Sequence, residues 1–176
     1  MEANTTERIL DAAERRIRDA GYNGFSFRDL AEDVGIKSAS VHYHFPTKEA
    51  LVATLTERYT ERFLQSLEDA PSGIRCILAY RDAFRRSLAE DRRMCLCGVL
   101  GAESGGLPDS VTRQARLFFE RTIQKLEQAL VGTVSEPHST AAAVVAQLQG
   151  AIILARAFGN IAAFDEATQE LAEKSS

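Results

Sequence analysis

Apolar residues recur every three or four positions along almost the whole chain, and this spacing is the feature that most restricts its fold. Leu51, Leu55 and Tyr59, for example, follow one another at four-residue intervals. That period places them on one face of an α-helix. Runs of alternating β-branched residues, which would indicate strands, are not present in the sequence. The sequence therefore predicts an all-α protein of about nine helices.

Two short helices joined by the segment VGIKS, residues 34–38, form the pattern of a helix-turn-helix. Gly35 can take the left-handed backbone conformation that such a tight turn needs. Pro46 must end the second of these helices, and Thr47 can cap the long helix that follows. With a first helix before them, they predict a three-helix head domain at residues 1–48.

The remaining residues, 49–176, are predicted to form a helical-bundle body that binds a ligand and dimerises. A long fourth helix joins the body to the head. Helices are expected at 48–69, 74–90, 94–103, 109–131, 137–158 and 161–173. Residues 137–164 carry a single charge, Arg156, and are apolar on more than one face, so they require burial. Because this stretch also contains Gln147 and Gln149, we expect burial in protein and no membrane span.

Composition limits the classes of partner and the compartment. The formal net charge of −4 gives no general basic surface, so binding of nucleic acid must depend on a local patch. Residues 34–48 supply one, because they contain Lys37 and Lys48 and no carboxylate. The polar opening MEANTTERI lacks the apolar core of a signal peptide, and three cysteines fit a reducing compartment. A cytoplasmic protein is therefore expected.

The second helix of the motif would turn its outer face to the major groove of DNA. Lysines and hydroxyls would meet phosphates, and short side chains would read base edges. For His44 a second possibility stays open, a ring packed against the core and hydrogen-bonded near the end of its helix. The candidate DNA-binding residues are Ser26, Arg28, Lys37, Ser38, Ala39, Ser40, His42, Tyr43, His44 and Lys48.

The stretch FSFRDLAEDVGIKSASVHYHFPTKEALV resembles the helix-turn-helix of the TetR family of bacterial transcriptional regulators. The matching positions are Ser26, Ala31, Gly35, Ile36, Tyr43, His44, Phe45, Lys48 and Leu51. The resemblance covers roughly residues 5–55, and one departure is His42, where the family most often has an aromatic residue. It implies an all-α homodimer, an operator of two half-sites, and a body that binds an inducer and releases the DNA.

The resulting hypothesis is a repressor that a small, largely apolar effector releases from a palindromic double-stranded operator. An activator with the same architecture stays open. The homodimer would form through the last two helices of each subunit. Arg156 would pair with Glu103 or with a group of the partner subunit, or hold an anionic ligand. The candidate effector-pocket residues are Tyr80, Phe84, Leu88, Met94, Cys97, Phe118, Phe119 and Arg156.

Other functions have weaker support in the sequence. Residues two apart on a helix point about 200° away from each other, so His42 and His44 cannot share a metal ion, and no metal or cofactor is expected. Cys95 and Cys97 are expected to pack as small buried hydrophobes, and the alternative is a thiol sensor of oxidants or electrophiles. A small helical enzyme is a third hypothesis. No nucleophile–base pair or paired carboxylates stand out, so the sequence predicts no enzymatic activity.

Overall fold

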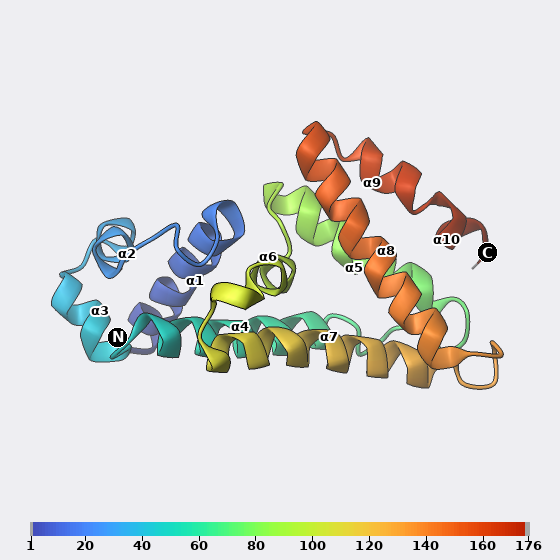
Figure 1. The fold of residues 1–176 in the computed structure, drawn as a ribbon, viewed down its shortest axis with the longest axis horizontal. Coiled ribbons are helices and arrows are strands. Elements are labelled where there is room, and N and C mark those ends of the chain that lie inside the picture. Colours follow the sequence, from blue (N-terminus) through green and yellow to red (C-terminus); the bar gives the residue numbers. More distant parts are fainter. Residues whose placement is uncertain (1, 175–176) are drawn as a thin grey trace. The chain divides into compact units, whose positions relative to one another are not determined.

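The computed structural model describes residues 2–174, and every regular element within them is a helix (Figure 1). In chain order the elements are α1 Glu2–Ala20, α2 Phe27–Val34, α3 Ser38–His44, α4 Lys48–Gln65, α5 Cys76–Asp91, α6 Leu96–Ala102, the short 3-10 helix η1 Ser104–Gly106, α7 Asp109–Leu130, α8 Pro137–Phe158, α9 Ala162–Ala167 and α10 Gln169–Lys174. The prediction of an all-α fold is confirmed.

The described chain has ten α-helices, one more than predicted, because its C-terminal segment is broken. The helix expected at 161–173 is divided at Thr168 into α9 and α10. The Thr168 hydroxyl donates to the Phe164 carbonyl at 2.7 Å, and the Thr168 N–H donates to the same oxygen at 3.1 Å. These bonds close the last turn of α9. The fourth helix is also shorter than predicted and ends at Gln65.

One compact unit consists of residues 1–60 and 96–116. In it, α2 packs against α1 and α3, and α6 packs against α1. Its completely buried apolar residues include Ile9, Ile17, Leu30, Val41, Leu51, Leu55 and Leu100. The Tyr22 N–H donates to Glu103 Oε2 at 2.9 Å, which links the end of α1 to the end of α6.

The second compact unit consists of residues 61–95 and 117–176. In it, α8 contacts α5 and α9, and α10 packs against α5 and α9. Its largest buried side chains include Tyr80, Phe84, Phe118, Leu126 and Phe164. In the packing of the chain, α6 and the start of α7 therefore belong to the same compact unit as the helix-turn-helix. The functional boundary expected between residues 48 and 49 stays a prediction.

Within a single chain, α8 leaves an apolar strip uncovered. The helix has 22 residues, and an 18-residue stretch of it has a mean hydropathy of 1.6, so by length and composition it could cross a membrane. Within the chain, 39% of that stretch is buried. The exposed fractions are 55% for Ile153, 43% for Leu154 and 70% for Phe158. Because Leu154 and Phe158 are four residues apart, they share a face of the helix. Contiguous exposed apolar side chains are more frequent at interaction surfaces than on the rest of a protein.

Candidate DNA-binding site

Local signals at both ends of α2 fix the turn before α3. At the start, Ser26 Oγ accepts from the Asp29 N–H at 3.4 Å, and Asp29 Oδ2 accepts from the Ser26 N–H at 2.7 Å. At the end, Gly35 has a φ of 72°, and its N–H donates to the carbonyls of Ala31 and Glu32. A left-handed glycine at this position closes a helix without a steric penalty. The turn predicted from the sequence is confirmed.

Few side chains hold α3 to its unit. Val41 is completely buried, and Phe45, directly after the helix, is 6% exposed. The His42 ring packs edge-on against Phe27, with 4.7 Å between the ring centroids. Apart from Val41 and the ring contact of His42, most of the surface of α3 lies outside the core. The outer face of α3 is therefore open to a partner.

Most of the predicted DNA contacts lie on this open face and at the start of α2. Their exposed members are Ser26, Arg28, Lys37, Ser38, Ala39, His42 and Tyr43, and Ser40 is partly exposed. Tyr43 is 77% exposed. Because the sequence from 34 to 48 contains no carboxylate, this face has no acidic side chain of its own to repel phosphate.

Two predicted contacts have partners inside the chain. His44 is partly buried, and its Nδ1 lies 3.1 Å from Thr6 Oγ1 on α1, with the donor set by the ring tautomer. This bond agrees with the second possibility for His44, a ring held near the end of its helix. The Ser26 hydroxyl donates to Asp29 Oδ2 at 2.8 Å, so it serves the cap of α2. Both groups position the motif.

Lys48, a third predicted contact, is also directed inward. Its Nζ donates to the Phe25 carbonyl and lies 4.1 Å from the Phe25 ring centroid and 4.9 Å from that of Tyr22. Burial lowers the pKa of Lys48, and the charge of Asp29 acts in the opposite direction. An ammonium over aromatic faces is attracted by their quadrupoles. Lys48 thus ties the start of α4 to the loop between α1 and α2.

The predicted effector residues do not form one group. Tyr80, Phe84 and Phe118 are buried together in the second unit, where the Phe63 ring lies 4.8 Å from Phe84 and 5.2 Å from Phe118. Cys97 is buried on α6 in the first unit. The remaining members belong to the second unit, where Leu88 is buried, Met94 and Phe119 are partly exposed and Arg156 is exposed. Thr122, which was not among the predicted residues, is completely buried one turn after Phe118 on α7.

A hollow of about 430 Å³ lies at the C-terminal ends of α5 and α8. Two predicted residues, Leu88 and Arg156, line it. The other lining residues are Arg85, Ala89, Arg92, Ala155, Gly159, Asn160 and Ile161. Arg156 Nη1 donates to the Arg92 carbonyl at 2.7 Å. A guanidinium is favourable there because the last carbonyls of a helix carry partial negative charge.

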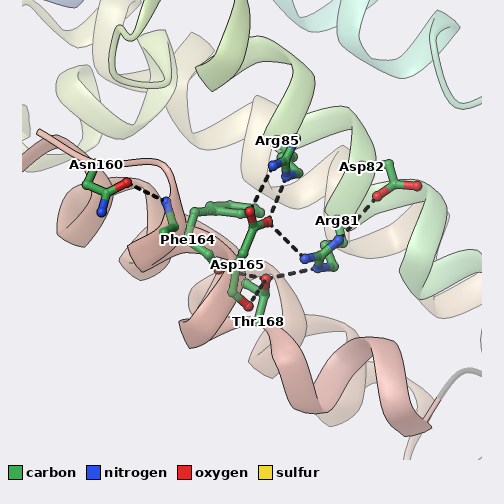
Figure 2. A network of polar contacts seen from close by, with 8 residues as sticks. Arg81, Asp82, Arg85, Asn160, Phe164, Asp165 and Thr168 are labelled. Carbon is green, nitrogen blue, oxygen red and sulfur yellow. Dashed lines mark hydrogen bonds and ion pairs between the residues drawn. The ribbon is translucent and has the colours of Figure 1, made fainter.

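Asp165 on α9 binds two arginines of α5 (Figure 2). Arg85 Nε and Nη2 donate to its two oxygens at 2.7 and 2.8 Å, and Arg81 Nη2 donates to Oδ1 at 3.0 Å. The hydrogen bonds from Arg85, with the charges of both arginines, hold the pKa of Asp165 below its usual value, although burial opposes them. Arg81 Nε also donates to the Thr168 hydroxyl at 2.9 Å. The sequence gives no signal for this network, because its partners are 80 or more positions apart.

The three cysteines are buried, with exposed fractions of 0% for Cys76, 3% for Cys95 and 0% for Cys97. Burial raises the pKa of the Cys76 thiol to about 11. Cys95 Sγ accepts from Gln149 Nε2 at 3.4 Å. Buried thiols react slowly, which favours packing over sensing at these positions. Among residues 2–174, no three His, Cys, Asp or Glu side chains gather as a metal site would require.

Comparison with known proteins decides the class. The sequence profile described as "Bacterial regulatory proteins, tetR family" matches residues 9–55. The crystal structure of a TetR transcriptional regulator from Legionella pneumophila is 32% identical in sequence. The alignment covers 96% of this chain and 95% of that one, with a TM-score of 0.88. The chain belongs to the TetR family.

Curated relatives agree with membership of the TetR family. An uncharacterized HTH-type transcriptional regulator in the lacX 3' region of Lactococcus lactis is 26% identical over 165 residues, which is 86% of this chain and 83% of the relative. The probable HTH-type transcriptional regulator YttP of Bacillus subtilis is 28% identical over 74 residues, and this chain spans only 36% of that protein. The chain is a TetR-family DNA-binding transcriptional regulator, and its fold and relatives are those of regulators and not of enzymes. Regulators of this family bind DNA and typically dimerise.

Proposed function

We propose that this protein is a cytoplasmic repressor that binds a palindromic operator as a homodimer and leaves it when a small, largely apolar effector binds. The observation that carries the proposal is the outer face of α3, which is exposed, free of carboxylates and held by the fixed turn at Gly35. A seven-residue helix offers few base contacts, so two copies on successive half-sites supply the affinity.

The predicted DNA-binding residues divide into two groups that contact DNA and one group that positions the motif. Arg28, Lys37 and Tyr43 meet phosphates, because they are exposed and carry charge or a hydroxyl. Short side chains on the exposed face, with His42, lie against base edges. The base-reading set is Ser38, Ala39, Ser40 and His42. Ser26, His44 and Lys48 hold the motif in place through the internal bonds described above.

The strip Ile153, Leu154 and Phe158 supports a dimer through α8 and the C-terminal helices. Three large apolar side chains on one helix are more than 40% exposed, and covering them with the same strip of a second copy removes them from water. An isologous contact of this kind also gives the two-fold symmetry that a palindrome requires.

Effector release is proposed to act through α4, which begins in the head and ends in the body. The effector prefers a dimer state in which the two α3 helices no longer fit successive major grooves. Only this difference in affinity between the two states can shift their populations.

Selection of bound duplexes from a random library by the full-length protein tests the proposal. We expect a two-fold symmetric site, and we expect His42→Ala with Ser40→Ala to change the preferred bases within each half-site. Val131→Ala, at an exposed position outside the motif, serves as the control and leaves the selected sequence unchanged. Recovery of a site without two-fold symmetry, or the same site with the double variant, would overturn the assignment.

A further inference from the structure

The Tyr80 hydroxyl meets the backbone of Thr122 inside the second compact unit. Tyr80 precedes Phe84 by one turn on α5, and Thr122 follows Phe118 by one turn on α7, so each hydroxyl shares a helix face with a phenylalanine. Tyr80 Oη lies 3.5 Å from the Thr122 carbonyl. Tyr80 is 1% exposed and Thr122 is completely buried. The buried aromatic cluster of Phe63, Phe84 and Phe118 is therefore followed, one helical turn away, by two buried residues that carry hydroxyl groups.

Thr122 differs from the other buried threonines. Its Oγ1 has no hydrogen-bond partner in the described part of the chain. A threonine inside a helix can donate its hydroxyl to the carbonyl four residues earlier. Thr56, Thr60 and Thr168 do so, at 2.7, 2.8 and 2.7 Å. A buried hydroxyl without a partner loses its hydration and gains nothing in return, so it indicates a missing group.

Tyr80 has hydrogen-bonding capacity left as well. Its bond to the Thr122 carbonyl is at the outer limit of length, and its oxygen can still accept. Burial raises the pKa of Tyr80 above its usual value, so the phenol is neutral. Cys76, one turn earlier on α5, is neutral too, because its thiol pKa is about 11. A charged molecule at this position would have no counter-ion among these groups.

We propose that Thr122 and Tyr80 form the hydrogen-bonding point of a binding site for a compact neutral molecule with an aromatic or apolar body and one hydroxyl group. The ligand hydroxyl accepts from Thr122 Oγ1 and donates to Tyr80 Oη, while the phenylalanine cluster contacts its body. This assignment rests on the proposed function, for which it names the chemical class of the effector.

Phenol and toluene have nearly the same shape and differ by a hydroxyl against a methyl group, as do threonine and valine. Titration calorimetry of the full-length protein without DNA, with phenol and with toluene, is carried out on the wild type and on Thr122→Val. We expect the wild type to bind phenol about tenfold more tightly than toluene. Thr122→Val abolishes or reverses this preference, and Tyr80→Phe reduces it.

Thermal unfolding without ligand tests independently whether the Thr122 hydroxyl has a hydrogen-bond partner. Removing a hydroxyl that has no partner raises the Tm of Thr122→Val by about 2–4 °C. The control Thr56→Val removes a hydroxyl of the same burial that has a partner, so it lowers the Tm and keeps the preference for phenol.

A lower Tm for Thr122→Val would show that this hydroxyl is already bonded in the ligand-free protein, for instance to a buried water, and would overturn the proposal. Equal binding of phenol and toluene by the wild type, or an unchanged preference in Thr122→Val, would do the same. None of these measurements involves an operator. Failure of the proposed repressor function, seen as absence of a selected DNA site, is therefore distinguishable from failure of this inference.

Discussion

The helices α3 and α9 are both short, and each is anchored by one completely buried side chain, Val41 in α3 and Phe164 in α9. Their polar groups differ. Asp165 of α9 is bound by two arginines of α5, whereas the segment around α3 contains no carboxylate and turns Tyr43 outward. The carboxylate of α9 is therefore bonded within the fold, whereas the polar face of α3 stays exposed.

Removal of the α9 anchor is expected to have the largest effect. Phe164→Ala deletes a completely buried ring and should lower the free energy of unfolding by about 3–5 kcal/mol. Urea denaturation at a fixed protein concentration measures it. Val131→Ala, at a position 67% exposed, is the control and should change stability by less than about 0.5 kcal/mol. A loss below about 1 kcal/mol for Phe164→Ala would mean that this ring does not anchor α9.

On α3 the expected effect falls on DNA binding and not on folding. Lys37→Ala should weaken operator binding at least about tenfold and reduce the slope of log affinity against log salt by about 1 for each half-site. Stability should change by less than about 0.5 kcal/mol, because Lys37 is exposed. Lys125→Ala removes the same charge from α7 and should leave the slope unchanged. An unaltered slope for Lys37→Ala would remove this residue from the phosphate contacts.

Lys48 separates positioning from phosphate contact. Lys48→Met keeps the aliphatic stem and removes the bond to the Phe25 carbonyl and the contacts with two rings. We expect a loss of about 1 kcal/mol in the free energy of unfolding, and weaker operator binding with an unchanged salt slope. Salt titrations by fluorescence anisotropy measure the slope. If the slope falls as it does for Lys37→Ala, Lys48 meets phosphate in the complex.

The smallest expected effect is at Asp165. Its pKa is lowered in the folded protein, so its contribution to stability is present above the ordinary aspartate pKa of about 3.9 and is lost as the pH falls through the folded value. Because Asp165 and Arg85 are partly exposed, Asp165→Asn should cost no more than about 1 kcal/mol near pH 7. The difference from wild type should begin to shrink near pH 4 and vanish only below the lowered pKa that Asp165 has in the folded protein. A difference that persists there would mean that the side-chain charge is not its cause. Asp82→Asn, whose carboxylate is more exposed, is the control with a smaller effect.

The sequence by itself determined the helical class, the turn between α2 and α3 and the outward face of α3. These features depend on interactions within about four residues, such as the capping box of Ser26 and Asp29 and the left-handed Gly35. Thr47 likewise accepts the Ala50 N–H at 3.1 Å, as expected for the cap of the fourth helix. Because all the residues that form such caps and turns lie close together in the sequence, these features could be predicted.

Only the tertiary structure decided where the long polar side chains point. Lys48 and His44 belong to the predicted DNA-binding set, yet they bond to Phe25 and Thr6, 23 and 38 positions away. Periodicity also could not show that Thr122 lacks the bond that Thr56 makes. A helix pattern fixes the face of a residue, whereas the partner of a flexible or hydroxyl side chain is set by whichever distant segment packs against that face.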